Sequence, residues 1–154
     1  MNYEFNTKSG NFFLYDMETG KNWYNYIWND HQFIVETDHF GGATAKLVTE
    51  RGESIILNGH ADQKLTTPSY VFIRDDDTND YFNPGFKPSC NQIENYCCEH
   101  GLAFTKVSGK RNGVFASDTI AVYEDEDAFI HKTVIKNESK ETKNLSVFGF
   151  AKFD

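Results

Sequence analysis

The sequence is poor in the residues that build disulfide frameworks, metal sites and membrane spans. Its 154 residues include 3 Cys, 3 Pro and 2 Met, and no apolar stretch approaches the roughly 18 residues needed to cross a bilayer. Cys90, Cys97 and Cys98 are odd in number, and their spacing suits neither a disulfide framework nor a zinc site. We therefore expect reduced thiols in a cytoplasmic protein, with no metal site and no membrane span.

Basic charge is also scarce. The chain has 15 Lys and Arg against 23 Asp and Glu, so its formal net charge is −8, and the basic residues are scattered singly. A surface that binds nucleic acid needs clustered Lys and Arg, so we expect no nucleic-acid partner. Residues 1–5 lack the basic and apolar segments of a signal peptide.

Recognisable catalytic motifs are missing as well. The five histidines have no metal-binding spacing, and neither a Gly-x-Ser-x-Gly elbow nor a phosphate-binding Gly-x-x-x-x-Gly-Lys occurs. The acidic run 75–80 has Asp80 and Phe86 where a calcium loop needs Gly and Glu, which favours a polar hairpin turn. The second acidic run, 124–127, is more typical of a solvated loop than of paired catalytic carboxylates. No catalytic residue is assigned.

What the sequence does contain is short β-rich runs between turn residues. Aromatics make up 16% of the chain, and no long window has helical periodicity. The turn signals include Gly41-Gly42, Asn58-Gly59 and Arg111-Asn112-Gly113. The fold class predicted is all-β, an antiparallel β-sandwich with few or no helices. The expected strands are residues 11–15, 33–37, 43–49, 54–57, 70–74, 80–83, 92–98, 102–107, 114–123, 128–136 and 144–153. His100 and Gly101 are expected to form a bend, where a positive φ would suit glycine.

Three side chains are candidates for contact with a sugar: Trp23, Trp28 and His100. The two tryptophans are the first and last residues of the aromatic cluster 23–28. Flat aromatic rings can stack on sugar rings while neighbouring polar groups bind the sugar hydroxyls. The alternative is that the cluster belongs to the core or an interface, because each ring carries a large apolar surface. His100 has the same two readings, sugar contact or a structural role.

The last expected strand is apolar or small on both faces from Val147 to Phe150. Such a strand normally lies inside a protein, with something packed on each side. This pattern suggests further protein beyond residue 154.

An ordered series of segments resembles the cellobiose and diacetylchitobiose phosphorylases of glycoside hydrolase family 94. The segments are NWYNY (22–26), the Gly41-Gly42 turn, SYVFIRDDD (69–77), DYF (80–82), EHGLAFTKV (99–107), NGV (112–114), VIKNES (134–139) and LSVFGF (145–150). The resemblance covers roughly residues 11–153, and residues 46–66 fit it least well. It implies that residues 1–154 are the front portion of an N-terminal β-sandwich domain, part of a larger supersandwich.

The resemblance also implies an activity. Family members carry out reversible, inverting phosphorolysis of a β-linked disaccharide or oligosaccharide, such as cellobiose or laminaribiose, with inorganic phosphate as co-substrate and no other cofactor. The catalytic Asp and the phosphate-binding groups belong to an (α/α) barrel expected to be absent from this chain, and the enzymes form homodimers. By this resemblance the 154 residues alone are inactive. The rival hypothesis is a stand-alone carbohydrate-binding β-sandwich module.

Overall fold

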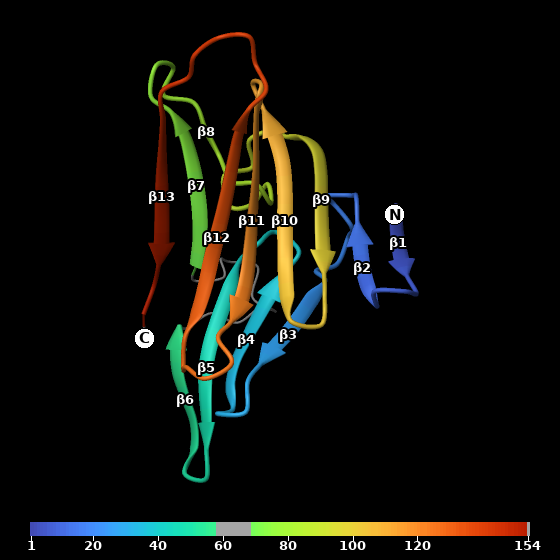
Figure 1. The fold of residues 1–154 in the computed structure, drawn as a ribbon, viewed down its shortest axis with the longest axis vertical. Helices are drawn as coiled ribbons and strands as arrows, with labels where there is room; N and C mark the ends of the chain where they lie inside the picture. The colour runs from blue at the N-terminus through green and yellow to red at the C-terminus, as the bar shows by residue number, and fades with distance from the viewer. Residues whose placement is uncertain (58–68, 154) are drawn as a thin grey trace.

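The computed structural model describes residues 1–57 and 69–153, which form strands and connecting turns (Figure 1). Within these residues there is no helix, and therefore none that could cross a membrane. The strands are β1 (Tyr3–Asn6), β2 (Asn11–Leu14), β3 (Tyr24–Trp28), β4 (Phe33–Asp38), β5 (Ala43–Thr49), β6 (Gly52–Leu57), β7 (Ser69–Asp75), β8 (Tyr81–Phe82), β9 (Glu94–His100), β10 (Phe104–Arg111), β11 (Val114–Val122), β12 (Phe129–Asn137) and β13 (Leu145–Ala151).

The strands form three antiparallel sheets. Sheet A has the order β1-β2-β9-β10-β11-β12, sheet B the order β3-β4-β5-β6, and sheet C the order β13-β7-β8. In Figure 1, sheet B forms the lower end of the molecule, and the two chain termini lie on opposite sides. The predicted fold class, an all-β antiparallel sandwich, is confirmed.

Two apolar clusters show how the sheets pack. One joins Leu14 and Val107 of sheet A to Ile73 and Phe82 of sheet C. The other joins sheet B to β11 of sheet A through a second set of buried residues, Phe33, Val35, Ala43, Ala45, Leu57 and Ile120. Sheet A is therefore one layer, and sheets B and C both pack on it. Burying a side chain such as Phe33 completely stabilises the fold by roughly 1.5–3 kcal/mol.

The turn between β10 and β11 follows directly from the sequence. Asn112 and Gly113 have φ of 48° and 80°, and they lie between the paired residues Arg111 and Val114. Two consecutive positive φ values define a type I′ turn, whose twist matches the right-handed twist of the flanking strands. Asn-Gly is the preferred sequence of this turn. The turn predicted at Asn58-Gly59 lies outside the described residues.

Most expected strands are present, and the differences have local causes. β1 was not expected, and β3 was treated only as an aromatic cluster. β9 runs on through His100, because its pairing with Thr105 continues the ladder. The bend expected at His100-Gly101 therefore starts at Gly101, whose φ is not positive. A Cβ on Gly101 would come within 2.4 Å of the Phe104 ring, so close packing is the reason that glycine fits there.

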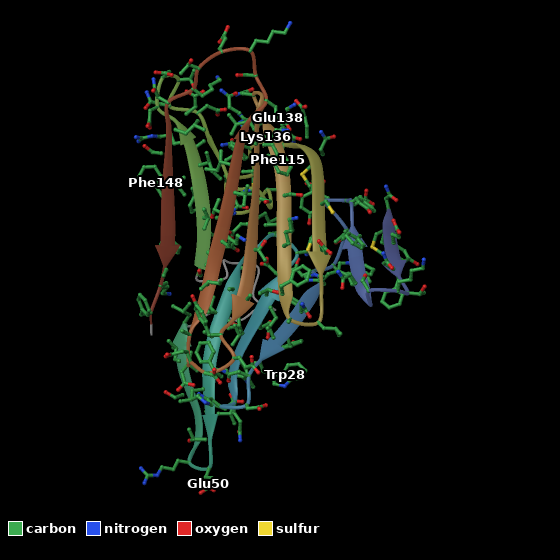
Figure 2. All side chains as sticks on the ribbon, viewed as in Figure 1. Trp28, Glu50, Phe115, Lys136, Glu138 and Phe148 are labelled. Atoms are coloured by element: carbon green, nitrogen blue, oxygen red, sulfur yellow. The ribbon has the colours of Figure 1, made fainter. Side chains whose placement is uncertain are left out.

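Strand β13 lies at the edge of sheet C, paired with β7 along its whole length. The apolar pattern predicted that this strand lies inside a protein, but within the described residues it is an exposed edge strand. Val147, Phe148 and Phe150 are each about half exposed, at 51%, 46% and 49%. Figure 2 shows Phe148 at the outer margin of the molecule. The strand thus presents apolar side chains to solvent on both faces.

Candidate functional site

Trp23 and His100 both contact the ring of Phe12, next to the core. The Trp23 ring stacks on Phe12 with centroids 4.9 Å apart, and the His100 ring stacks on Phe12 at 6.4 Å. Trp23 also packs against the apolar cluster between sheets A and C, and its backbone N–H donates to His39 Nδ1 at 3.1 Å. The structure therefore brings two of the three predicted sugar-contact residues into one aromatic cluster.

His100 belongs to a buried hydrogen-bond network that joins sheet A to sheet B. Its Nδ1 lies 3.0 Å from Thr105 Oγ1, which lies 2.6 Å from Thr37 Oγ1. The Asn25 amide donates to Thr105 Oγ1 at 3.2 Å and to the carbonyl oxygen of Gly101 at 2.9 Å. One consistent arrangement has the Thr37 hydroxyl donating to Thr105 and the Thr105 hydroxyl donating to His100 Nδ1. This arrangement requires a neutral imidazole.

Burial keeps that imidazole neutral. His100 is 8% exposed, and burial lowers the pKa of its ring from 6.5 to about 4, with the neighbouring His39 adding to the effect. His39 is 1% exposed, and burial lowers its pKa to about 4 as well. Desolvation disfavours the charged form of each ring. The geometry around His100 thus holds the sheets together, and its contact with a sugar stays a prediction.

Trp28 lies apart from this cluster. It is at the far end of β3 and is 67% exposed, and Figure 2 shows it projecting away from the strands. Tyr26, two residues earlier and so on the same face, is 52% exposed. These two exposed rings form an open aromatic surface on β3, which is one of the edge strands of sheet B. Such a surface suits stacking on a sugar, which stays a prediction.

The acidic run 75–80 forms the predicted polar hairpin turn. The Asp75 backbone N–H donates to the Asp80 carbonyl oxygen at 2.8 Å, and Arg111 makes two hydrogen bonds to the Asp80 carboxylate, at 2.7 and 2.9 Å. The hydrogen bonds from Arg111 lower the pKa of Asp80 below its usual range, and Lys143 does the same for Asp75. A general acid needs a raised pKa, so these carboxylates are held in the wrong state for that role.

The cysteines are free thiols. Burial raises the pKa values of Cys97 and Cys98, so neither is favoured as a thiolate nucleophile. Among residues 1–57 and 69–153, no group of three or more His, Cys, Asp or Glu side chains is placed to hold a metal ion.

A pocket that the sequence did not predict opens where β6, β7, β12 and β13 approach one another. Its volume is about 500 Å³, and apolar side chains such as Phe33, Phe129 and Phe150 form most of its wall. Ser69 and His131 also line it. Sequence reasoning passed over these two residues because they are 62 positions apart and belong to no known spacing.

Two known phosphorylases resemble the chain, one of them along nearly its whole length. It is 28% identical to solabiose phosphorylase of Paenibacillus borealis over 150 residues, which cover 96% of this chain and 19% of that protein. It is 37% identical to the N,N'-diacetylchitobiose phosphorylase of Vibrio proteolyticus over 86 residues, which cover 54% of this chain and 11% of that protein. The chain therefore spans about a fifth or less of the length of these relatives.

A family model agrees with both the resemblance and the fold. The model described as the supersandwich domain of glycosyl hydrolase 94 matches residues 13–153. That range takes in strands from β2 to β13, and thus all three sheets of the described structure. The chain belongs to the supersandwich domain family of glycosyl hydrolase 94.

Proposed function

We propose that residues 1–154 are the front portion of the N-terminal sandwich domain of an inverting glycoside phosphorylase. The match of residues 13–153 to the supersandwich family carries this proposal, and the phosphorylases among its relatives support it. The catalytic (α/α) barrel would lie in a different part of the same polypeptide. The enzyme would be a cytoplasmic homodimer without an organic cofactor.

In this proposal the chemistry needs inorganic phosphate and a disaccharide. Phosphate would attack the anomeric carbon of a β-linked sugar in one displacement, releasing a sugar 1-phosphate and a free sugar. Cellobiose and laminaribiose are the substrates we favour, and solabiose and N,N'-diacetylchitobiose are the alternatives that the names of the relatives suggest. The sandwich would contribute an interface and a wall of the active site. It would not supply the general acid, because the carboxyl groups of its acidic turn have lowered pKa values.

The test compares two proteins. The 154-residue chain and the full translation product of its gene would each be incubated with phosphate and, in turn, the four disaccharides, and sugar 1-phosphate would be measured. We expect release from the full product with at least one disaccharide and none from the 154-residue chain. Release of sugar 1-phosphate that co-purifies with the 154-residue chain would overturn the assignment. A full translation product with no phosphorolytic activity on any of the four disaccharides would also overturn it.

The exposed aromatic surface of β3 favours a second candidate, a stand-alone carbohydrate-binding module. Trp28 and Tyr26 leave their rings open to solvent on an edge strand. Calorimetric titration of the chain with cello-oligosaccharides would test it, with Trp28→Ala as the variant and Tyr81→Ala, another exposed aromatic, as the control. Binding that only Trp28→Ala abolishes would support a module. Absence of binding by the unaltered chain would remove this candidate.

A further inference from the structure

A chain of hydrogen-bonded side chains from three strands begins in the wall of the apolar pocket. Ser69 Oγ of β7 lies 2.7 Å from His131 Nε2 of β12, and His131 Nδ1 lies 2.6 Å from Asp118 Oδ2 of β11. The Thr133 hydroxyl donates to the other carboxylate oxygen, Asp118 Oδ1, at 2.9 Å. Ser69 and His131 line the pocket, and Asp118 lies behind them at 2% exposure.

Sheet geometry explains how Asp118 and His131 meet. Asp118 is paired directly with Thr133 across the β11–β12 ladder, and His131 lies two residues from Thr133 on the same strand. Side chains two apart share one face, so a single carboxylate can reach both the paired residue and its diagonal neighbour. Ser69 arrives from a different sheet, where β7 packs between β13 and β8. Ser69 therefore reaches His131 only because sheet C packs on sheet A.

We propose that Ser69, His131 and Asp118 form a nucleophile–base–carboxylate triad that hydrolyses esters of apolar acyl groups. The order of contacts is the one that such chemistry needs: a hydroxyl on one imidazole nitrogen and a buried carboxylate on the other. The carboxylate holds the proton on Nδ1, which leaves the Nε2 lone pair directed at the serine hydroxyl. The apolar wall of the pocket selects an apolar acyl group, because polar groups would lose hydration there.

The reaction balances with water as the only co-reactant. Ser69 Oγ attacks the acyl carbon while its proton passes to His131 Nε2, and the ester C–O bond then breaks as the leaving alcohol takes that proton. Water attacks the resulting acyl-serine, and its proton passes through His131 Nε2 back to Ser69 Oγ as the carboxylic acid leaves. The net change is ester plus water to acid plus alcohol.

The test labels the serine and maps it. The 154-residue chain would be treated with a fluorophosphonate probe at pH 7.5 and digested, and the modified peptide would be identified by mass spectrometry. Hydrolysis of p-nitrophenyl butyrate would be followed in parallel. We expect the adduct on Ser69, and a fall of at least about 100-fold in labelling and hydrolysis rates in His131→Gln, the usual contribution of a general base. Ser69→Ala should abolish the adduct.

A matched control separates this role from a structural one. Ser108 is also a strand serine, and its hydroxyl donates to the Cys97 carbonyl oxygen at 3.4 Å, so Ser108→Ala should keep both rates. Circular dichroism would confirm that each variant is folded, and mapping the adduct on the unaltered chain needs no variant at all. Failure of the folded, unaltered chain to label at Ser69 would overturn the proposal. Equal labelling of the unaltered chain and folded His131→Gln would do the same.

Discussion

Lowering the pH from 7 to 5 should destabilise the protein through His39 and His100. Burial holds the pKa of each ring near 4 in the folded state, against an ordinary value of 6.5. The unfolded chain therefore binds more protons than the folded chain between about pH 6.5 and 4. The stability that the neutral rings provide is fully present above pH 6.5 and is lost as the pH falls toward 4.

The size of the effect follows from the two pKa values. A pKa difference of one is worth about 1.4 kcal/mol, so at pH 5 each histidine costs about 2 kcal/mol and the two together about 4 kcal/mol. A domain is typically stable by only about 5–15 kcal/mol. Carboxyl groups whose pKa values are lowered, such as that of Asp80, stay ionised between pH 7 and pH 5 and so do not contribute to this loss.

Urea denaturation at pH 7 and pH 5 measures the loss directly. His100→Gln should reduce the loss of unfolding free energy by about half, to about 2 kcal/mol. His31 is the matched control, because its side chain is 49% exposed beside Asp127, and His31→Gln should keep the full loss. Two results would refute the reasoning. One is an unfolding free energy that is the same at both pH values, and the other is an equal loss in the two variants.

Three further predictions concern stability and association. Gly101→Val should lower the unfolding free energy by about 1–3 kcal/mol, because a Cβ there meets the Phe104 ring at 2.4 Å; an unchanged urea midpoint would contradict this. Tyr96→Phe should cost about 1–3 kcal/mol, because the buried hydroxyl donates to a backbone carbonyl oxygen at 2.6 Å. Tyr81→Phe, at an exposed position, should stay within about 0.5 kcal/mol in the same assay. The apolar surface of β13 should make the isolated chain bind a hydrophobic dye and self-associate, and Phe148→Lys should weaken both, as measured by fluorescence and light scattering. A dye-silent monomer would count against that view.

Strand positions were predictable because their signals are local. Alternating apolar residues and turn residues act within a few positions, and β5 begins and ends where the sequence predicted. β3 was missed as a strand because its aromatic residues lie on the more exposed face, while Asn25 shares the opposite face with the buried Ile27, so apolar and polar residues do not alternate as they do in a half-buried strand. β9 extended to His100 because cross-strand pairing with Thr105, which no local pattern encodes, continued the ladder.

The candidate sites were less predictable. The sequence identified Trp23, Trp28 and His100 as chemically suited to a sugar, but it could not separate the half-buried Trp23 from the exposed Trp28. Both belong to one aromatic run, and the distinction depends on which side of the chain meets another sheet. No sequence pattern marked Ser69 or His131 as a pair, because they meet only where β7 and β12 come together.

The sequence by itself determined the all-β class, the Asn112-Gly113 hairpin and the family, because each depends on local residue preferences or on the order of short segments. Only the tertiary structure decided that His39 and His100 are buried neutral, and that Ser69 meets His131 beside Asp118. The physical reason is the same for both. Period-two alternation specifies which side chains share a face of a strand, whereas desolvation and side-chain contact depend on which faces of the three sheets pack together.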